Sequence, residues 1–124
     1  SDTPEVDYDG DTDVTEGIAH EIATLEDALI VAIKDNALNT AGAPIGYDAH
    51  KYPYFFGDAN ANGVFDADEG AYTSWTPNLL RAAYNYQWVQ KDPGAYAHNG
   101  LYIIQVLYDS LANSGADVTA YTRP

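Results

Sequence analysis

The stretch that organises the chain is the twelve-residue run Asp58-Ala59-Asn60-Ala61-Asn62-Gly63-Val64-Phe65-Asp66-Ala67-Asp68-Glu69. A loop that curls around a hard cation points oxygen atoms inward at alternate residues, and a glycine at its sixth position permits the sharp turn. The spacing therefore predicts a calcium loop. Its expected ligands are Asp58, Asn60, Asn62, the carbonyl of Val64, Asp66 acting through water, and both carboxylate oxygens of Glu69.

This spacing is that of an EF-hand loop, and the competing interpretation is a solvated acidic turn. The flanking residues 52–57 and 70–75 contain proline, glycine and aromatic side chains, which argues against an entering or a leaving helix. Because a calcium sensor changes the angle between two flanking helices, we interpret the loop as a structural clamp. Two asparagine ligands lower the charge of the sphere, so a weak dissociation constant on the order of 10⁻⁴ to 10⁻³ M is expected.

Length and composition restrict the remaining possibilities. A chain of 124 residues is expected to form a single domain with one core. Nineteen acidic against five basic residues give a net charge of −14, which argues against nucleic acid and anionic membrane surfaces as partners. The absence of cysteine excludes thiolate zinc sites, iron–sulfur ligation and a cysteine nucleophile. No apolar run is long enough for membrane insertion.

The N-terminal residues 1–13 form an acidic arm in which carboxylates alternate with other residues. Alternation of this kind suits a second, irregular calcium site, although the late glycine and the closing glutamate of an EF-hand loop are missing. An arm that stays solvated is the alternative, since blocks of like charge repel one another. The ligands of the second site would be Asp7, Asp9, Asp11, Asp13 and Glu16.

Residues 14–115 are predicted to form a helical core of three amphipathic helices. The first runs from Val14 to Asn39, with Asp13 and Glu16 as a capping box and Gly42 as a stop signal. The second opens with Thr76 as N-cap and Pro77 at the first helical position, and it ends near Lys91. One face of this second helix carries Leu80, Ala83, Tyr84 and Trp88, with Leu79, Ala82 and Tyr86 beside it.

The third helix is predicted to be capped by Asn99 and stopped by Gly115. Its apolar stripe consists of Leu101, Ile104, Tyr108 and Leu111, widened by Ile103 and Leu107. Residues 40–57 form a long loop that needs an organiser, and residues 116–124 form an extended tail. The predicted fold is therefore mainly α: about three amphipathic helices with long irregular aromatic loops tied by calcium.

The sequence shows no catalytic constellation, so we do not expect an enzyme. Its three histidines, His20, His50 and His98, lack the spacing of a zinc motif and are expected to be hydrogen-bonded structural residues. No serine lies in a nucleophile elbow, and no glycine-rich phosphate loop is present. The acids Glu21, Glu26 and Asp27 form the main cluster outside the calcium loops, and they are interpreted as a solvated helix face.

Several runs of this sequence resemble the haem-free C-terminal region of microbial multihaem c-type cytochromes. The resemblance implies an extracellular, secreted or periplasmic setting and association with electron-transfer proteins. It also implies that His98, in Ala97-His98-Asn99, is a candidate haem ligand in trans, with the haem contributed by a partner chain because Cys-x-x-Cys-His is absent. The runs that carry the resemblance are residues 16–25, 52–56, 75–87, 91–99 and 105–110.

The function expected from these observations is that of a non-catalytic, calcium-stabilised extracellular domain with a structural or interaction role. Its expected partners are a second copy of itself or a multihaem cytochrome chain, contacted through its aromatic surface. The alternative is a self-assembling subunit of an extracellular filament or surface layer, with the acidic arm and residues 119–124 as joining elements.

Overall fold

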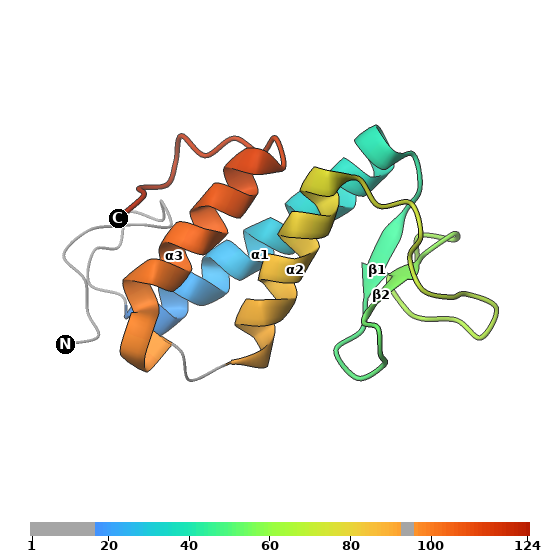
Figure 1. The fold of residues 1–124 in the computed structure, drawn as a ribbon, viewed down its shortest axis with the longest axis horizontal. Coiled ribbons are helices and arrows are strands. Elements are labelled where there is room, and N and C mark those ends of the chain that lie inside the picture. Colours follow the sequence, from blue (N-terminus) through green and yellow to red (C-terminus); the bar gives the residue numbers. More distant parts are fainter. Residues whose placement is uncertain (1–16, 93–95) are drawn as a thin grey trace.

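The computed structural model describes residues 17–92 and 96–124, with the side chains of residues 96–98 outside that description. The elements in chain order are helix α1 (Ile18–Asn36), a π-helical turn η1 (Ala37–Ala41), strands β1 (Ile45–Tyr47) and β2 (Phe55–Gly57), and helices α2 (Pro77–Lys91) and α3 (Tyr96–Asn113) (Figure 1). The prediction of a mainly α fold with three helices is confirmed.

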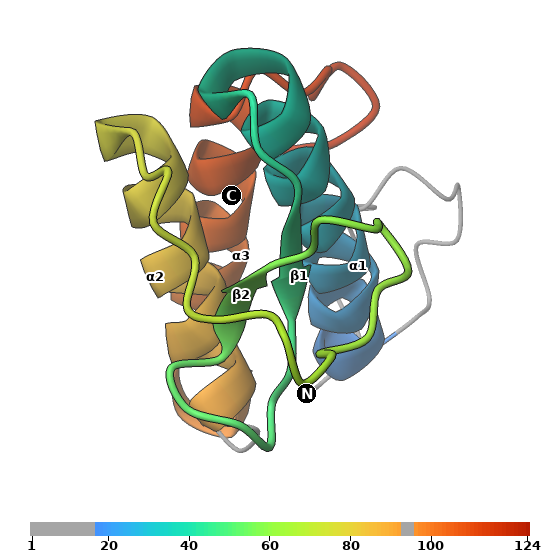
Figure 2. The same cartoon turned by 90° about the vertical axis from the view of Figure 1, so that its right-hand side faces the viewer.

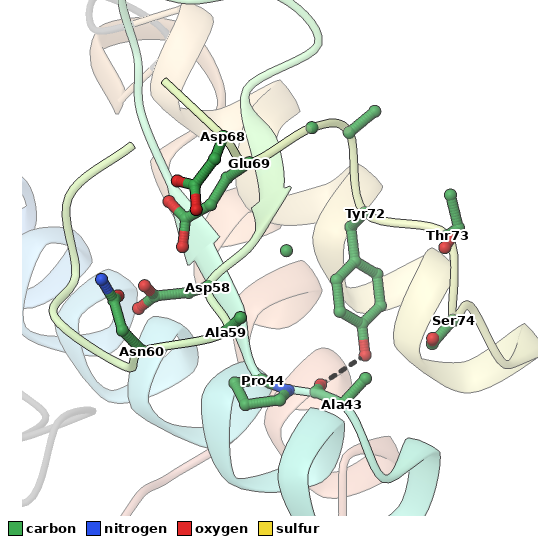
Figure 3. Close-up of a pocket in the computed structure, with 13 residues that line it drawn as sticks. Ala43, Pro44, Asp58, Ala59, Asn60, Asp68, Glu69, Tyr72, Thr73 and Ser74 are labelled. Atoms are coloured by element: carbon green, nitrogen blue, oxygen red, sulfur yellow. Dashed lines mark hydrogen bonds between the residues drawn. The ribbon is translucent and has the colours of Figure 1, made fainter. Parts of the chain in front are cut away.

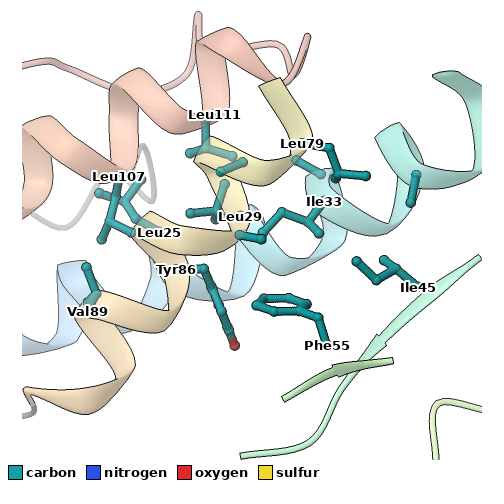
Figure 4. Packing of buried hydrophobic residues seen from close by; sticks show 14 of the residues in the cluster. Leu25, Leu29, Ile33, Ile45, Phe55, Leu79, Tyr86, Val89, Leu107 and Leu111 are labelled. Atoms are coloured by element: carbon teal, nitrogen blue, oxygen red, sulfur yellow. The ribbon is translucent and has the colours of Figure 1, made fainter. Parts of the chain in front are cut away.

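The core lies between the three helices, with the short hairpin covering one end of it. Helix α1 packs against both α3 and α2, and Figure 2 shows the hairpin in front of the helices. Figure 4 shows side chains of α1, α2 and α3 converging on one apolar cluster that Ile45 and Phe55 of the hairpin extend. The large apolar side chains that are fully buried at its centre are Leu25, Leu29, Ile33, Leu79, Ile103, Ile104, Leu107 and Leu111.

Helix α1 buries Ile22, Leu25, Leu29 and Ile33, which recur every three or four residues and so lie on one side of the helix. The helix begins at Ile18 with Gly17 as N-cap and no side-chain cap, so its start lies later than predicted. The predicted capping box of Asp13 and Glu16 lies outside the described residues. At the other end α1 continues into η1, and Gly42 stops it with a left-handed φ of 75°.

Helix α2 has the predicted bounds, because its start is encoded locally. The Leu79 N–H donates to Thr76 Oγ1 at 3.2 Å, and Pro77 occupies the first helical position. The packed face differs from the predicted stripe: Leu80, Tyr84 and Trp88 are exposed. The buried residues of α2 are Leu79, Ala82, Ala83, Tyr86 and Val89.

Helix α3 begins at Tyr96, three residues before the predicted cap. Asn99 has non-helical dihedral angles (φ −137°, ψ 36°), so it marks a kink inside α3 instead of the helix start. Beyond the kink the buried residues are Gly100, Ile103, Ile104, Leu107, Ser110 and Leu111, whereas Leu101 is exposed. Gly115 follows the helix end with φ 83°, as expected of a stop signal.

Residues 40–57 contain a small antiparallel hairpin that the sequence did not predict. Gly46 of β1 pairs with Phe56 of β2, and the neighbouring pair is Tyr47 with Phe55. The hairpin binds the helices through aromatic rings: Tyr47 lies 5.1 Å from Tyr86 of α2, measured between ring centroids. The long loop is therefore organised in part by its own strand pairing and by aromatic packing on α2.

The tail of residues 116–124 has no regular secondary structure and runs back along α3. Arg123 forms a two-pronged ion pair with Asp109, with its Nε 2.9 Å and its Nη2 3.1 Å from the two carboxylate oxygens. Gln105 donates to the backbone carbonyl of Pro124 at 2.8 Å. The tail contacts its own helix through these bonds.

Candidate metal centre

The loop of residues 58–69 begins directly after β2, which places Asp58 at the edge of the core. Only 4% of the Asp58 surface is exposed. Its Oδ1 accepts from the Asn62 N–H at 3.2 Å and its Oδ2 accepts from the Gly63 N–H at 2.8 Å. Asp58 therefore holds the first half of the loop in a tight turn through these two bonds. Gly63 adopts the left-handed conformation that the turn requires, with φ 75°.

The asparagines at the third and fifth positions orient their carbonyl oxygens through turns of the same type. Asn60 Oδ1 accepts from the Asn62 N–H at 3.3 Å, and Asn62 Oδ1 accepts from the Val64 N–H at 2.9 Å. Side chains that bond to the backbone two residues ahead hold a tight turn. The alternating Asn60 and Asn62 therefore each hold a tight turn of the loop.

Asp66 is bound by the two asparagines. Its Oδ2 accepts from Asn60 Nδ2 at 2.8 Å and from Asn62 Nδ2 at 2.9 Å. These two amide groups stabilise the Asp66 carboxylate by hydrogen bonding without neutralising its charge. For the two asparagines to act as ligands instead, their Oδ1 atoms would have to turn toward the metal.

Glu69 closes the loop with one satisfied and one unsatisfied oxygen. Its Oε1 accepts from the Asp66 N–H at 2.7 Å. Its Oε2 is buried and has no hydrogen-bond partner within the part of the chain that the structure describes. A buried carboxylate oxygen without a partner is unfavourable, and a divalent cation is a ligand that would satisfy it.

The carboxylates of Asp58, Asp68 and Glu69 line one side of a pocket of about 370 Å³, opposite Tyr72, Thr73 and Ser74 (Figure 3). Asp68 occupies a loop position to which the EF-hand pattern assigns no ligand, so the motif did not select it. In the described part of the chain, no three His, Asp or Glu side chains are grouped as metal ligands. Calcium binding therefore stays a prediction from the motif.

Backbone and ring contacts hold the loop on the core. The Gly57 N–H donates to the Gly70 carbonyl at 2.9 Å, which joins the residues on either side of the loop. The Phe65 ring lies 5.4 Å from the Phe56 ring, edge to face, and Lys51 Nζ lies 4.7 Å from the Phe65 centroid. Strand β2 precedes the loop and non-helical residues follow it, as predicted. The loop therefore has no flanking pair of helices whose angle could change on calcium binding.

The side chains of the remaining predicted site residues lie outside the part of the chain that the structure describes. Asp7, Asp9, Asp11, Asp13 and Glu16 lie outside the described residues. His98 lies in the first turn of α3, and its side chain is also outside the description. His50 lies in the turn of the hairpin, where its backbone N–H donates to Asp48 Oδ1 at 2.9 Å.

The acid cluster of α1 is not a solvated face, and that interpretation was wrong for Glu21, which is fully buried. Glu26 is partly buried beside α2, and burial raises the pKa of its carboxyl despite a hydrogen bond from Gln90. Asp27 is exposed, as predicted. The error arose because residues 21, 22 and 25 lie on adjacent parts of one helical turn, so the buried stripe of α1 takes in Glu21.

Comparison with known proteins relates the chain to one segment of polyhaem cytochromes. It is 36% identical over 106 residues to the C-type polyheme cytochrome OmcB of Geobacter sulfurreducens, which covers 73% of this chain and 14% of OmcB. It is also 36% identical over 77 residues to OmcC of the same organism, covering 52% of this chain and 10% of OmcC. The chain thus spans about a seventh of OmcB, and the predicted resemblance to multihaem cytochromes is confirmed.

No protein-family model matches the chain, and no solved structure matches it. Within the described residues, none of the helices is long and apolar enough to cross a membrane.

Proposed function

We propose that this chain is a non-catalytic, calcium-stabilised interaction domain that works in a multihaem cytochrome assembly for electron transfer. The observation that carries the proposal is the 36% identity to OmcB over 73% of the chain. The proposed setting is extracellular or periplasmic.

The absence of cysteine defines what the domain would contribute to such an assembly. Covalent attachment of c-type haem uses cysteine thiols, and this chain has none. A covalently bound haem would therefore be attached outside these 124 residues, and His98 is the proposed axial ligand to such a haem. The domain's own part would be to present a stable surface.

Calcium would supply that stability by tying the loop of residues 58–69. The motif spacing and the unsatisfied Oε2 of Glu69 support this part of the proposal. Asp58 and Glu69 would hold the ion with the Val64 carbonyl, and Asn60, Asn62 and Asp66 would complete the sphere after exchanging their mutual hydrogen bonds for metal contacts. A filament subunit has less support, because Arg123 and Pro124, part of a proposed joining element, bond to their own α3.

Binding to purified OmcB tests the association directly. The chain is immobilised and OmcB is passed over it in millimolar calcium, with a monohaem c-type cytochrome as the control. We expect saturable binding to OmcB, weaker binding when a chelator replaces calcium, and no binding to the control. Equal signals for OmcB and for the control would contradict the proposed association.

A further inference from the structure

The outward side of α2 carries an unusual group of exposed side chains. Arg81, Tyr84 and Trp88 recur at intervals of three and four residues and so lie on one stripe of the helix. Tyr102 of α3 joins this stripe, since its ring centroid lies 6.2 Å from that of Trp88. We call Arg81, Tyr84, Trp88 and Tyr102 the α2 outer face.

The rings of the α2 outer face are accessible to another molecule. Tyr84 is 69% exposed, Tyr102 57% and Trp88 39%, and a shallow groove of about 190 Å³ lies between them. Exposed apolar side chains that occur singly need no explanation, but a contiguous group marks an interaction surface. Tryptophan, tyrosine and arginine are also the residues that most often dominate binding energy at protein interfaces.

The charge of this region differs from that of the rest of the chain. Residues 77–113 contain two bases, Arg81 and Lys91, and two acids, Asp92 and Asp109, so the net charge of −14 resides elsewhere. Asp109 is already paired with Arg123. Within the described residues, the Arg81 side chain makes no hydrogen bond or ion pair.

From these observations we propose that the α2 outer face binds a second copy of this chain about a two-fold axis. In an antiparallel pair of α2 helices with the axis between Tyr84 and Asn85, position 81 of one copy faces position 88 of the other. Each Arg81 guanidinium then lies over the Trp88 indole of the second copy, and the contact occurs twice. The face is self-complementary because it carries both partners of this contact, Arg81 and Trp88. Helix α2 contains no acidic residue that would compete for Arg81.

Self-association through this face has a distinctive dependence on salt. Two chains of net charge −14 repel one another at low ionic strength, and salt screens that repulsion. The contacts within the face are short-range aromatic and cation–π contacts, which salt screens less than the repulsion between the two net charges. The dimer is therefore expected to strengthen as salt is added, the reverse of an interface held by opposite charges.

Sedimentation equilibrium of the purified chain, at concentrations from about 1 µM to about 1 mM, tests the proposal. We expect a reversible dimer that Arg81→Glu and Trp88→Ala each weaken by at least about tenfold. The double variant Arg81→Trp with Trp88→Arg exchanges the two partners and should restore the dimer. Val31→Ala is the matched control, since Val31 is an exposed apolar residue of α1.

A wild-type chain that stays monomeric throughout this range would overturn the proposal. So would a dimer that the Arg81 and Trp88 variants leave unchanged, or a swapped double variant as weak as the single ones. Circular dichroism confirms that each variant is folded. The measurement contains no cytochrome, so its outcome is independent of the proposed association with OmcB.

Discussion

The ring of Phe65 meets the ring of Phe56 edge to face, with 5.4 Å between the centroids, and this contact joins the candidate calcium loop to the hairpin. Phe56 is buried, whereas Phe65 is partly exposed. Replacing Phe65 by alanine should lower the free energy of unfolding by about 1–2 kcal/mol, because the ring pair and part of its apolar burial are lost. Chemical denaturation measures the change. Val64→Ala, at a side chain that is 61% exposed, is the control and should change stability little.

Gly46 is required by the same hairpin. A Cβ atom on Gly46 would lie 2.3 Å from Cζ of Phe56, so Gly46→Ala must displace that buried ring. We expect a loss of about 1–3 kcal/mol in the free energy of unfolding. Gly70→Ala is the matched control, because a Cβ on Gly70 meets nothing within 4 Å. Equal stabilities of the two variants would show that the Phe56 ring does not occupy this position.

The N-cap of α2 gives a local test. Thr76→Ala removes the oxygen that accepts from the Leu79 N–H, and it should cost about 1 kcal/mol. Thr76→Ser keeps that oxygen and should remain close to the wild type in thermal denaturation. If serine is as destabilising as alanine, the hydroxyl does not cap the helix.

Buried tyrosines should make the fold sensitive to alkali. Burial, followed by smaller effects of Tyr47, Glu26 and Asp27, raises the pKa of Tyr86 to about 12. The unfolded chain releases this proton at its ordinary pKa of about 10, so the unfolded state binds fewer protons than the folded one above that pH. Stability from Tyr86 is therefore complete below pH 10 and is lost as pH rises toward 12.

Phenolate absorbance and denaturation, measured together from about pH 9 to 12, check this expectation. Tyr86→Phe should reduce the fall in stability over this range, whereas Tyr52→Phe, at an exposed ring, should not. The same alkaline fall in Tyr86→Phe as in the wild type would contradict the assignment.

The parts of the fold that were predictable are those encoded by near neighbours. Thr76 and Pro77 define the start of α2, and Gly42 and Gly115 stop helices, because capping depends on a few adjacent residues. The buried face of α2 was not predictable in this way. Leu79 and Leu80 both begin apolar stripes, and packing against α1 and α3 selects the stripe of Leu79. The hairpin was missed because three-residue strands carry too little periodicity to be recognised.

The candidate site likewise combines hydrogen bonds that near neighbours in the sequence predict with others that they do not. The Gly63 N–H donates to Asp58 and the Val64 N–H donates to Asn62, in the tight turn that the loop spacing predicts. The bonds from Asn60 and Asn62 to Asp66 could not be predicted, since an asparagine side chain can present either an oxygen to a cation or an N–H to a carboxylate. The motif therefore predicts the turn of the loop but not which side-chain atoms face a cation.

Thermal denaturation of the wild type and of Glu69→Ala, in millimolar calcium and in excess chelator, tests the central claim that calcium ties this fold. Calcium bound only by the folded state raises its stability, and Glu69→Ala removes two of the proposed ligand oxygens. We expect the wild type to melt well above Glu69→Ala in calcium and the two to nearly coincide in chelator, with Asp27→Ala, at an exposed acid of α1, behaving as the wild type does. If Glu69→Ala matches the wild type in both conditions, the loop of residues 58–69 is an acidic turn and calcium has no part in this fold.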